Sequence, residues 1–180
     1  SDASSRGLEG LAAATGWLRG DGDTQLTIQE HGWRLTLDIA TGHKTGYYLD
    51  QRDNRALFAH IVASRQATRV FNGHSYTGGF TLAALAGGAT DVLSVDSSAA
   101  ALAQARANVE LNQLDLAACR FLDADVNATL REHLARGERF DAVVLDPPKL
   151  APTVAHAERA ARAYKDLNRL GLSLLAPGGV

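Results

Sequence analysis

The chain has 180 residues, of which 46% are apolar, and a formal net charge of −2. This length can bury a substantial core, and the charge excludes a strongly basic protein that coats nucleic acid. The one cysteine, Cys119, excludes an internal disulfide, and no Cys/His cluster has zinc spacing, so we expect no metal. No apolar run approaches the ~20 residues that span a bilayer, and no secretory signal is recognisable at the first residues. We therefore expect a soluble, cytoplasmic protein with no membrane partner.

Residues 1–52 predict a small β-rich segment. Their short runs of alternating apolar and polar residues are separated by His31-Gly32 and Thr41-Gly42, which is typical of antiparallel strands. Three strands are expected, at 26–28, 33–39 and 47–49.

Residues 53–180 predict an α/β domain, because helical patterns alternate with buried-strand patterns. Asn54 is the expected cap of the first helix, and Ser97 or Ser98 caps a later one. Buried strands are expected at 70–71, 92–95, 121–122 and 140–145, and the last helix from about 156 to 175. The order predicts a Rossmann-like parallel sheet behind the small antiparallel segment.

The chain stops at Pro177-Gly178-Gly179-Val180, where the alternation would continue with another strand. It also contains no methionine. We interpret it as part of a longer protein, with a parallel sheet of four strands that is truncated at its C-terminal end.

Three polar turns follow three of the expected strands. Thr77-Gly78-Gly79 lies between a strand and a helix, where backbone N–H groups can approach an anionic ligand group closely. A tight turn chosen for packing would have the same residues, so this motif alone decides little. Asp96 ends the next strand about twenty residues later, where a carboxylate can accept both hydroxyls of a ribose. Asp125, after the third strand, can accept a hydrogen bond from an adenine amino group, although Asp96 and Asp125 could each simply cap a helix.

The most specific local motif is Asp146-Pro147-Pro148-Lys149. Two prolines directly after a buried strand hold the backbone extended without an N–H to satisfy, which directs Asp146 into the crevice at the strand ends. In methyltransferases that act on exocyclic amines, a similar motif has an aromatic fourth residue that stacks on the flipped base. Lys149 in that position disfavours adenine amine methylation and suits a phosphate or a base carbonyl. Together the three turns predict S-adenosylmethionine as cofactor and methyl transfer as the reaction.

Five ordered motifs in this sequence resemble the bacterial 23S rRNA cytosine-5 methyltransferase family of the I type. They are residues 44–52, 75–80, 94–97, 146–149 and 164–168. The resemblance implies a PUA RNA-binding domain before Ser1, a central β-rich segment over 1–52, and a methyltransferase domain from residue 53 that continues beyond Val180. It implies 23S rRNA as partner and is compatible with a homodimer.

The resemblance also implies the site residues. Those expected to bind S-adenosylmethionine are Gln51, Arg52, Ser75, Tyr76, Thr77, Gly78, Gly79, Asp96, Ser97, Asp125 and Asp146. Asp146 and Lys149 are the expected catalytic residues, and no metal is implied.

Two departures from the family pattern qualify this assignment. Family members usually have Cys-Phe where this chain has Gly73-His74, and His74 is either a pocket residue or a tolerated polar substitute. Family members also carry a nucleophilic cysteine on a later strand, and this chain ends first. Cys119 is expected to be a small buried apolar residue at the opposite end of the sheet. Since cytosine C5 reacts only after a thiolate adds at C6, we expect these 180 residues alone not to methylate RNA.

Three alternatives remain open at this stage. The first is methylation of guanine N7, which is already nucleophilic, although related enzymes usually have threonine after Asp-Pro-Pro. The second is an NAD(P)-dependent oxidoreductase, which Gly78-Gly79 disfavours because it lacks the Gly-x-Gly-x-x-Gly spacing. The third is a non-catalytic RNA- or cofactor-binding module, for which a carboxylate such as Asp96 beside a glycine loop is unnecessary.

Overall fold

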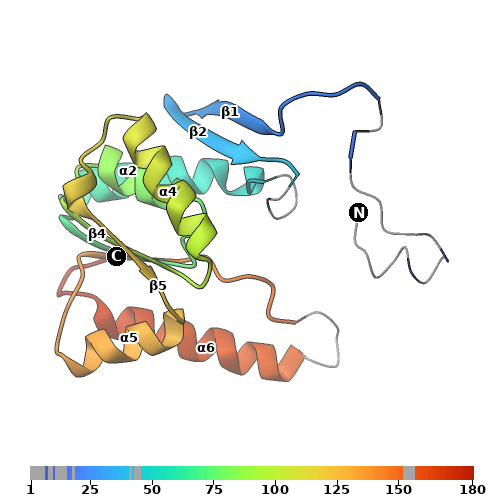
Figure 1. Ribbon diagram of the computed structural model, residues 1–180. Coiled ribbons are helices and arrows are strands. Elements are labelled where there is room, and N and C mark those ends of the chain that lie inside the picture. The colour runs from blue at the N-terminus through green and yellow to red at the C-terminus, as the bar shows by residue number, and fades with distance from the viewer. Residues whose placement is uncertain are drawn as a thin grey trace.

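The computed structural model describes residues 7, 10, 16–17, 19–40, 42, 46–151 and 157–180. Within them, a two-stranded antiparallel sheet accompanies a four-stranded parallel sheet that has helices on both faces (Figure 1). The strands are β1 (Gln25–Glu30), β2 (Trp33–Asp38), β3 (Arg69–Gly73), β4 (Asp91–Asp96), β5 (Cys119–Asp123) and β6 (Ala142–Leu145). The helices are α2 (Arg52–Arg65), α3 (Gly79–Ala86), α4 (Ala99–Leu111), α5 (Val126–Ala135) and α6 (Ala157–Leu174). The expected α/β architecture is confirmed.

The parallel sheet has the strand order β5-β4-β3-β6, and both of its faces are buried. On one face, Val70 and Val92 pack with apolar residues of α2 and α3. On the other face, Phe71 and Leu93 pack with α5 and α6. Successive residues of a strand point to opposite faces, so a sheet covered on both sides needs apolar residues at every position. This explains the consecutive apolar residues Val70-Phe71, Val92-Leu93 and Ala142–Leu145 in its strands.

All four strands run in the same direction, so their carboxyl ends meet at one edge of the sheet. Gly73 at the end of β3 lies opposite Val95 in β4 and Leu145 in β6, and Asp96 lies opposite Asp123 in β5. The loops that leave this edge contain the three polar turns singled out in the sequence. Parallel pairing therefore brings together residues that are up to 72 positions apart in the chain.

The β1–β2 hairpin packs against α3 and α4 rather than standing apart. Leu35 and Leu37 are buried with Leu82 and Val109 in a core of their own. The fully buried Asn108 of α4 adds a polar link, because its side chain accepts a hydrogen bond from the Thr36 N–H (2.9 Å) and donates one to the Thr77 carbonyl (3.0 Å). Asn108 thus links the hairpin to the glycine loop, residues 75–79.

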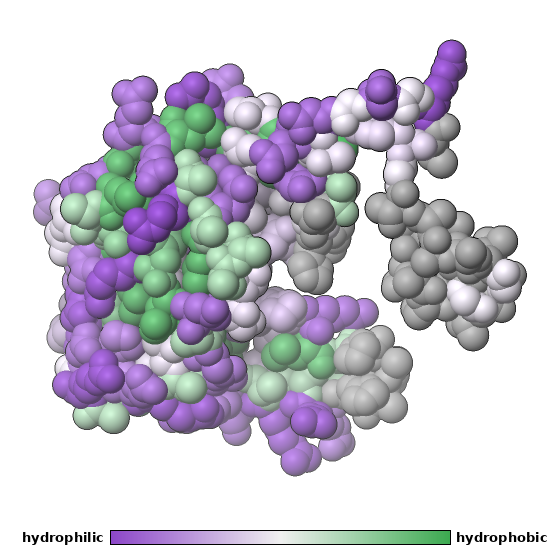
Figure 2. Space-filling model, viewed as in Figure 1, coloured by the Kyte–Doolittle hydropathy of each residue, from purple (hydrophilic) through white to green (hydrophobic). Residues whose placement is uncertain are grey.

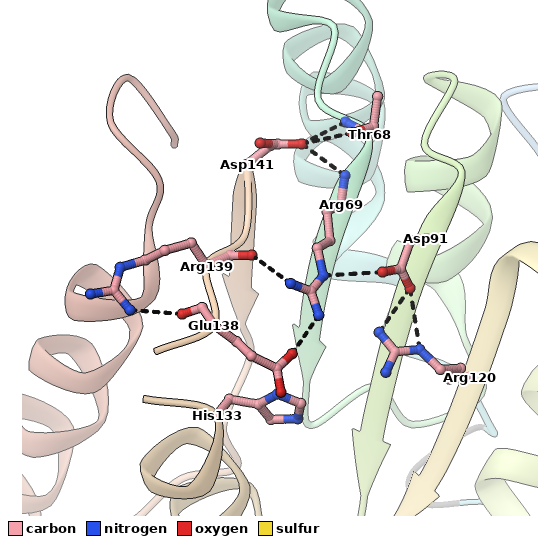
Figure 3. Close-up of polar contacts among 8 residues, drawn as sticks. All are labelled: Thr68, Arg69, Asp91, Arg120, His133, Glu138, Arg139 and Asp141. Carbon is pink, nitrogen blue, oxygen red and sulfur yellow. Dashed lines mark hydrogen bonds and ion pairs between the residues drawn. The ribbon is translucent and has the colours of Figure 1, made fainter. Parts of the chain in front are cut away.

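A network of charged residues ties the strands together at their amino ends, on the edge opposite the polar turns (Figure 3). The Arg69 guanidinium donates to Asp91 (3.1 Å), to Glu138 (2.5 Å) and to the Arg139 carbonyl (3.1 Å). Asp141 accepts hydrogen bonds from the Thr68 and Arg69 N–H groups and from the Thr68 hydroxyl, each at 2.9 Å. These bonds hold the pKa of Asp141 below its usual value. We call these residues, with Arg120, the amino-edge cluster.

Several expected elements differ in detail. Residues 47–49 form no strand, because Tyr47 is buried beneath the glycine loop and a 3-10 turn begins at Leu49. Asn54 does not cap α2, which already begins at Arg52; the Asn54 side chain instead donates to Gln51 Oε1 (2.8 Å). Ser98 caps α4 as expected, accepting from the Ala101 N–H (3.2 Å).

One face of α2 is buried against the sheet. Phe58 is 9% exposed and Val62 is fully buried, whereas Leu57 is 56% exposed.

At the far end of the chain, the Val180 N–H donates to the Asp141 carbonyl (2.9 Å) and the Val180 carbonyl accepts from the Val143 N–H (2.8 Å), so Val180 lies along the outer edge of β6.

The surface is mostly hydrophilic over α5 and α6, whereas apolar atoms reach it along α4 and β5 on the side viewed in Figure 2. Leu122 of β5 is 39% exposed. No helix among the described residues is long and apolar enough to cross a membrane.

Candidate active site

The glycine loop, residues 75–79, has a backbone that only particular residues can adopt. Tyr76 and Gly78 have φ angles of 46° and 85°, in the left-handed region that favours glycine. A Cβ atom on Gly78 would lie 2.8 Å from the Ala105 Cβ, and one on Gly79 would lie 2.8 Å from the Arg55 Cδ. Both glycines are therefore needed because α4 and α2 approach the loop too closely for a side chain. Left-handed non-glycine residues such as Tyr76 tend to occur at functional sites.

Two hydroxyls in this loop are buried without a partner. Ser75 Oγ and Thr77 Oγ1 accept and donate no hydrogen bond within the described part of the chain, although both residues are buried. A buried polar group without a hydrogen bond costs about 1–3 kcal/mol, so such groups call for an explanation. A polar ligand that bonds to both hydroxyls would satisfy them.

Asp96 holds the glycine loop to α4. One of its carboxylate oxygens accepts from the Tyr76 N–H (2.8 Å), and the other accepts from the Ser98 N–H (3.0 Å). Because each carboxylate oxygen has two acceptor sites, Asp96 retains capacity for two further donors. Ser97, beside it, is exposed.

Asp125 caps α5, which is the alternative role that its position suggested. Its side chain accepts from the Ala128 N–H at 2.7 Å, and the residue is exposed at the carboxyl edge of the sheet. The cap uses one acceptor site, so Asp125 can still accept a bond from a ligand.

Asp146 faces the glycine loop across a small cavity. The same cavity is lined by Ser75, Thr77, His74 and Arg55. Burial raises the pKa of Asp146, and the nearby Asp50 carboxylate raises it further, while Arg55 and His74 oppose the shift. The carboxyl group is therefore protonated more readily than an exposed aspartic acid.

The loop that carries Asp146 is fixed from α6. The Tyr164 hydroxyl donates to the Pro148 carbonyl (3.2 Å) and accepts from the Leu150 N–H (3.2 Å). One hydroxyl thus spans the turn that contains Lys149, whose own side chain is exposed. Tyr164 is the first residue of the motif at 164–168, for which the sequence predicted no role.

His74 lies among the carboxylates of the site. Its φ angle is 60°, and it is half-buried at the end of β3. Burial lowers its pKa, against the opposing effect of Asp96, Asp125 and Asp146. The neutral imidazole therefore adds no fixed positive charge to the cavity, and His74 is a pocket residue by position.

Gln51 lines a cavity, whereas the Arg52 side chain is mostly exposed. Gln51 lines a second cavity of about 290 Å³ that it shares with Asp146, between α2 and β6. The Arg52 side chain is 58% exposed and lies 3.5 Å from Asp53. The arginine that lines the cavity with the glycine loop is Arg55, one helical turn further along α2.

Comparison with known proteins identifies the family. The model of the S-adenosylmethionine-dependent methyltransferase family matches residues 10–180. The chain belongs to this family. A ribosomal RNA large subunit methyltransferase I from Aeromonas salmonicida is 49% identical over 181 residues, and so is one from Serratia proteamaculans. Each match covers the whole chain but only 45% of the relative, so the chain spans less than half the length of these proteins.

Solved structures agree with this family assignment. A methyltransferase from Streptococcus mutans is 30% identical and superposes with a TM-score of 0.74 over 87% of this chain and 40% of its own. A methyltransferase complexed with S-adenosylhomocysteine has the same identity and coverage and a TM-score of 0.75. A methyltransferase from Agrobacterium tumefaciens, 20% identical with a TM-score of 0.78 over 91% of this chain and 53% of its own, shows the shared fold.

The residues of this chain fit S-adenosylmethionine, the cofactor of the family. Three features lie at one edge of the sheet. They are the hydroxyls of Ser75 and Thr77 that have no partner among the described residues, the Gly79 backbone, which a ligand can approach closely because it has no side chain, and the free acceptor sites of Asp96. Lys44, the first residue of the motif at 44–52, lies outside the described residues. Among the described residues, no group of three or more acidic, histidine or cysteine side chains is arranged to hold a metal ion.

Cys119 lies where the sequence predicted. It is the first residue of β5, at the opposite edge from Asp146, and is 9% exposed. Burial raises the pKa of its thiol to about 11. A thiol with so high a pKa is almost entirely protonated near neutral pH, which makes it a weak nucleophile.

Proposed function

We propose that this chain is the cofactor-binding part of an S-adenosylmethionine-dependent methyltransferase that methylates C5 of a cytosine in 23S rRNA. Relatives that are named ribosomal RNA large subunit methyltransferase I and match the whole chain at 49% identity support an rRNA substrate. The observation that carries the proposal is the position of Asp146, which shares one cavity with Ser75 and Thr77. In this proposal Asp146 contacts the target base and lies beside the groups that contact the cofactor.

Each cofactor-binding residue has a distinct role in this proposal. The hydroxyls of Ser75 and Thr77 and the loop at Gly78-Gly79 hold the methionine part, while Asp96 accepts from the ribose hydroxyls. Asp125 accepts from the adenine amino group, with Ser97 beside the ring. When bound, S-adenosylmethionine supplies an electrophilic methyl group on a positively charged sulfur.

Asp146 is the residue proposed to activate the base. Its raised pKa favours a carboxyl group that can share its proton with a ring nitrogen of cytosine, which withdraws electrons from C6. A thiolate then adds at C6 and makes C5 nucleophilic. Lys149, exposed at the end of the same turn, is proposed to contact a phosphate or a base carbonyl.

The thiolate is not assigned to Cys119, which lies at the wrong edge of the sheet with a raised pKa. We place the thiol in a part of the protein outside these 180 residues, together with an RNA-binding domain. In the same proposal, residues 1–52 form a β-rich segment and residues 53–180 belong to the methyltransferase domain.

Incubation of the longer protein that contains this chain with unmodified 23S rRNA and isotopically labelled S-adenosylmethionine tests the proposal. Nucleoside analysis should find the label in 5-methylcytidine. Asp146→Asn should reduce the rate by about 10²–10⁴-fold, as expected for loss of an acid–base group. Asp53→Asn, at a side chain that is 92% exposed, is the matched control and should have no effect. Label in 7-methylguanosine, or full activity of Asp146→Asn, would refute the cytosine-5 assignment.

A further inference from the structure

The buried face of α2 carries an arginine. Arg55 precedes Phe58 and Val62 at helical spacing, and its side chain is only 3% exposed. Arginine is rarely buried unless it is paired, because removing a charge from water is costly. The partner here is Glu30 at the end of β1, also 3% exposed, which accepts two hydrogen bonds from the guanidinium at 2.6 and 2.8 Å.

Further contacts fix the orientation of this pair. The Tyr47 hydroxyl donates to Glu30 (3.2 Å), and the Arg55 guanidinium carbon lies 4.4 Å from the centre of the Tyr47 ring. The Arg55 nitrogen Nη2 also donates to the Tyr48 carbonyl (3.1 Å). These bonds use Nε and Nη2. The other terminal nitrogen, Nη1, donates to no residue that the structure describes.

Arg55 lies directly beneath the glycine loop. A Cβ atom on Gly79 would be 2.8 Å from Arg55 Cδ, 3.3 Å from Arg55 Nε and 3.0 Å from the Tyr47 hydroxyl. Gly79 is also the first residue of α3, whose free N–H groups carry partial positive charge. The cation and the helix N-terminus therefore meet beside the same cavity, which Ser75 and Thr77 line with their unpartnered hydroxyls.

The charges around this cavity determine which end of the cofactor suits it. Arg55 is the one permanently charged cation among the described residues that line the cavity, and Asp146 is the one carboxylate. S-adenosylmethionine carries a single anionic group, the carboxylate of its methionine part. That group would be repelled by Asp146 unless a cation lay beside it, and guanidinium pairs with carboxylate more strongly than a neutral donor does.

We propose that Arg55 binds the carboxylate of S-adenosylmethionine through its free terminal nitrogen, and that Glu30 and Tyr47 position it. The inference rests on the cofactor site assigned to the glycine loop, and not on the identity of the methylated base. It assigns to Arg55 a cofactor contact of the kind that the family resemblance implied for Arg52. It also makes the hairpin part of the cofactor site, since Glu30 belongs to β1.

The test compares two ligands that differ only in the carboxylate: S-adenosylmethionine and its decarboxylated form, measured by calorimetry without RNA. The wild-type protein should bind S-adenosylmethionine about tenfold to a hundredfold more tightly, as a charge-assisted hydrogen bond predicts. Arg55→Gln should remove this preference by weakening the binding of S-adenosylmethionine alone. Arg65→Gln, at the exposed last residue of the same helix, is the matched control and should keep the preference intact.

Arg55→Lys protects the test against a folding defect. Lysine keeps the charge opposite Glu30, but its single ammonium cannot span Glu30 and the ligand as the guanidinium does, so the preference should again be lost. Thermal unfolding of each variant reports whether it is folded. Equal affinity of the wild-type protein for the two ligands would overturn the proposal. So would a fall in affinity that is the same for both ligands in a folded Arg55 variant, because that is the signature of a structural role. Because no RNA is present, neither result depends on whether cytosine is the target.

Discussion

Substitution of Gly78 by alanine should separate backbone strain from crowding in the glycine loop. Gly78 has a φ of 85°, and a Cβ atom there would meet the Ala105 Cβ at 2.8 Å. Gly88, at the end of α3, has a φ of 99° and open space around the corresponding position. Both alanines adopt a left-handed conformation, but only one collides with a neighbour. Gly88→Ala is therefore the matched control.

The magnitudes follow from these two terms. A left-handed alanine costs about 1–2 kcal/mol, and loss of glycine's freedom in the unfolded chain offsets about 0.4–1 kcal/mol of it. Gly88→Ala should therefore lower the free energy of unfolding by roughly 1 kcal/mol. Crowding in a packed core adds about 1–3 kcal/mol, so Gly78→Ala should lower it by roughly 2–4 kcal/mol. Gly78→Ala should also weaken S-adenosylmethionine binding, whereas Gly88→Ala should not.

Urea unfolding and calorimetry measure both quantities. Adding Ala105→Gly to Gly78→Ala removes the colliding methyl group, so the double variant should recover about 1 kcal/mol or more relative to the sum of the single changes. Equal losses of stability for Gly78→Ala and Gly88→Ala, or no recovery in the double variant, would refute the assignment of the Gly78 requirement to its approach to α4.

Three other predictions concern separate parts of the molecule. Asp96→Ala should weaken S-adenosylmethionine binding about tenfold to a hundredfold in calorimetry, since bonds to a charged acceptor are worth about 1.5–3 kcal/mol each; unchanged affinity would remove it from the site. The lowered pKa of Asp141 means that its contribution to stability is complete above its unfolded value of 3.8 and is lost as the pH falls through the folded value. The difference in thermal midpoint between wild type and Asp141→Asn should therefore be largest near neutral pH and shrink below pH 3.8; a constant difference down to pH 2 would contradict this. In the longer protein that contains this chain, Tyr164→Phe should lower the rate of RNA methylation while leaving cofactor affinity unchanged, with Ser173→Ala on the exposed side of the same helix as control; equal rates for the two variants would show that the Tyr164 hydroxyl does not hold the turn.

The parallel sheet could be predicted because its sequence signal is local. The buried strand Ala142–Leu145 is a continuous apolar run, and the turns at Gly78-Gly79 and Asp146-Pro147 follow buried strands. The antiparallel strands at 25–38 also followed from alternation. Residues 47–49 were wrongly predicted as a strand because Tyr47 and Tyr48 favour β structure, while the contacts that bury Tyr47 come from α2 and β1.

The site was harder to predict, because its contacts join distant parts of the chain. In the sequence, Arg52 and Arg55 are both candidates for a contact with the cofactor. In the structure, the Arg52 side chain is exposed and the Arg55 side chain is buried. The signal that could have found Arg55 is its spacing of three and seven residues from Phe58 and Val62, which places a charge on the apolar stripe of the helix. Its partner, Glu30, is 25 residues away and has no local signature.

The amino-edge cluster has a practical consequence for engineering this protein. Five-residue β3 extends roughly 16 Å, so the cluster and the glycine loop lie at opposite ends of a rigid strand. Improved ion pairing around Arg69 and Asp91 would raise heat tolerance without altering the shape of the cofactor cavity. Conversely, stability gained at the amino edge would compensate for stability lost when the cavity is redesigned for a different cofactor. Stability and activity, which often conflict in enzymes, could thus be changed separately in this protein.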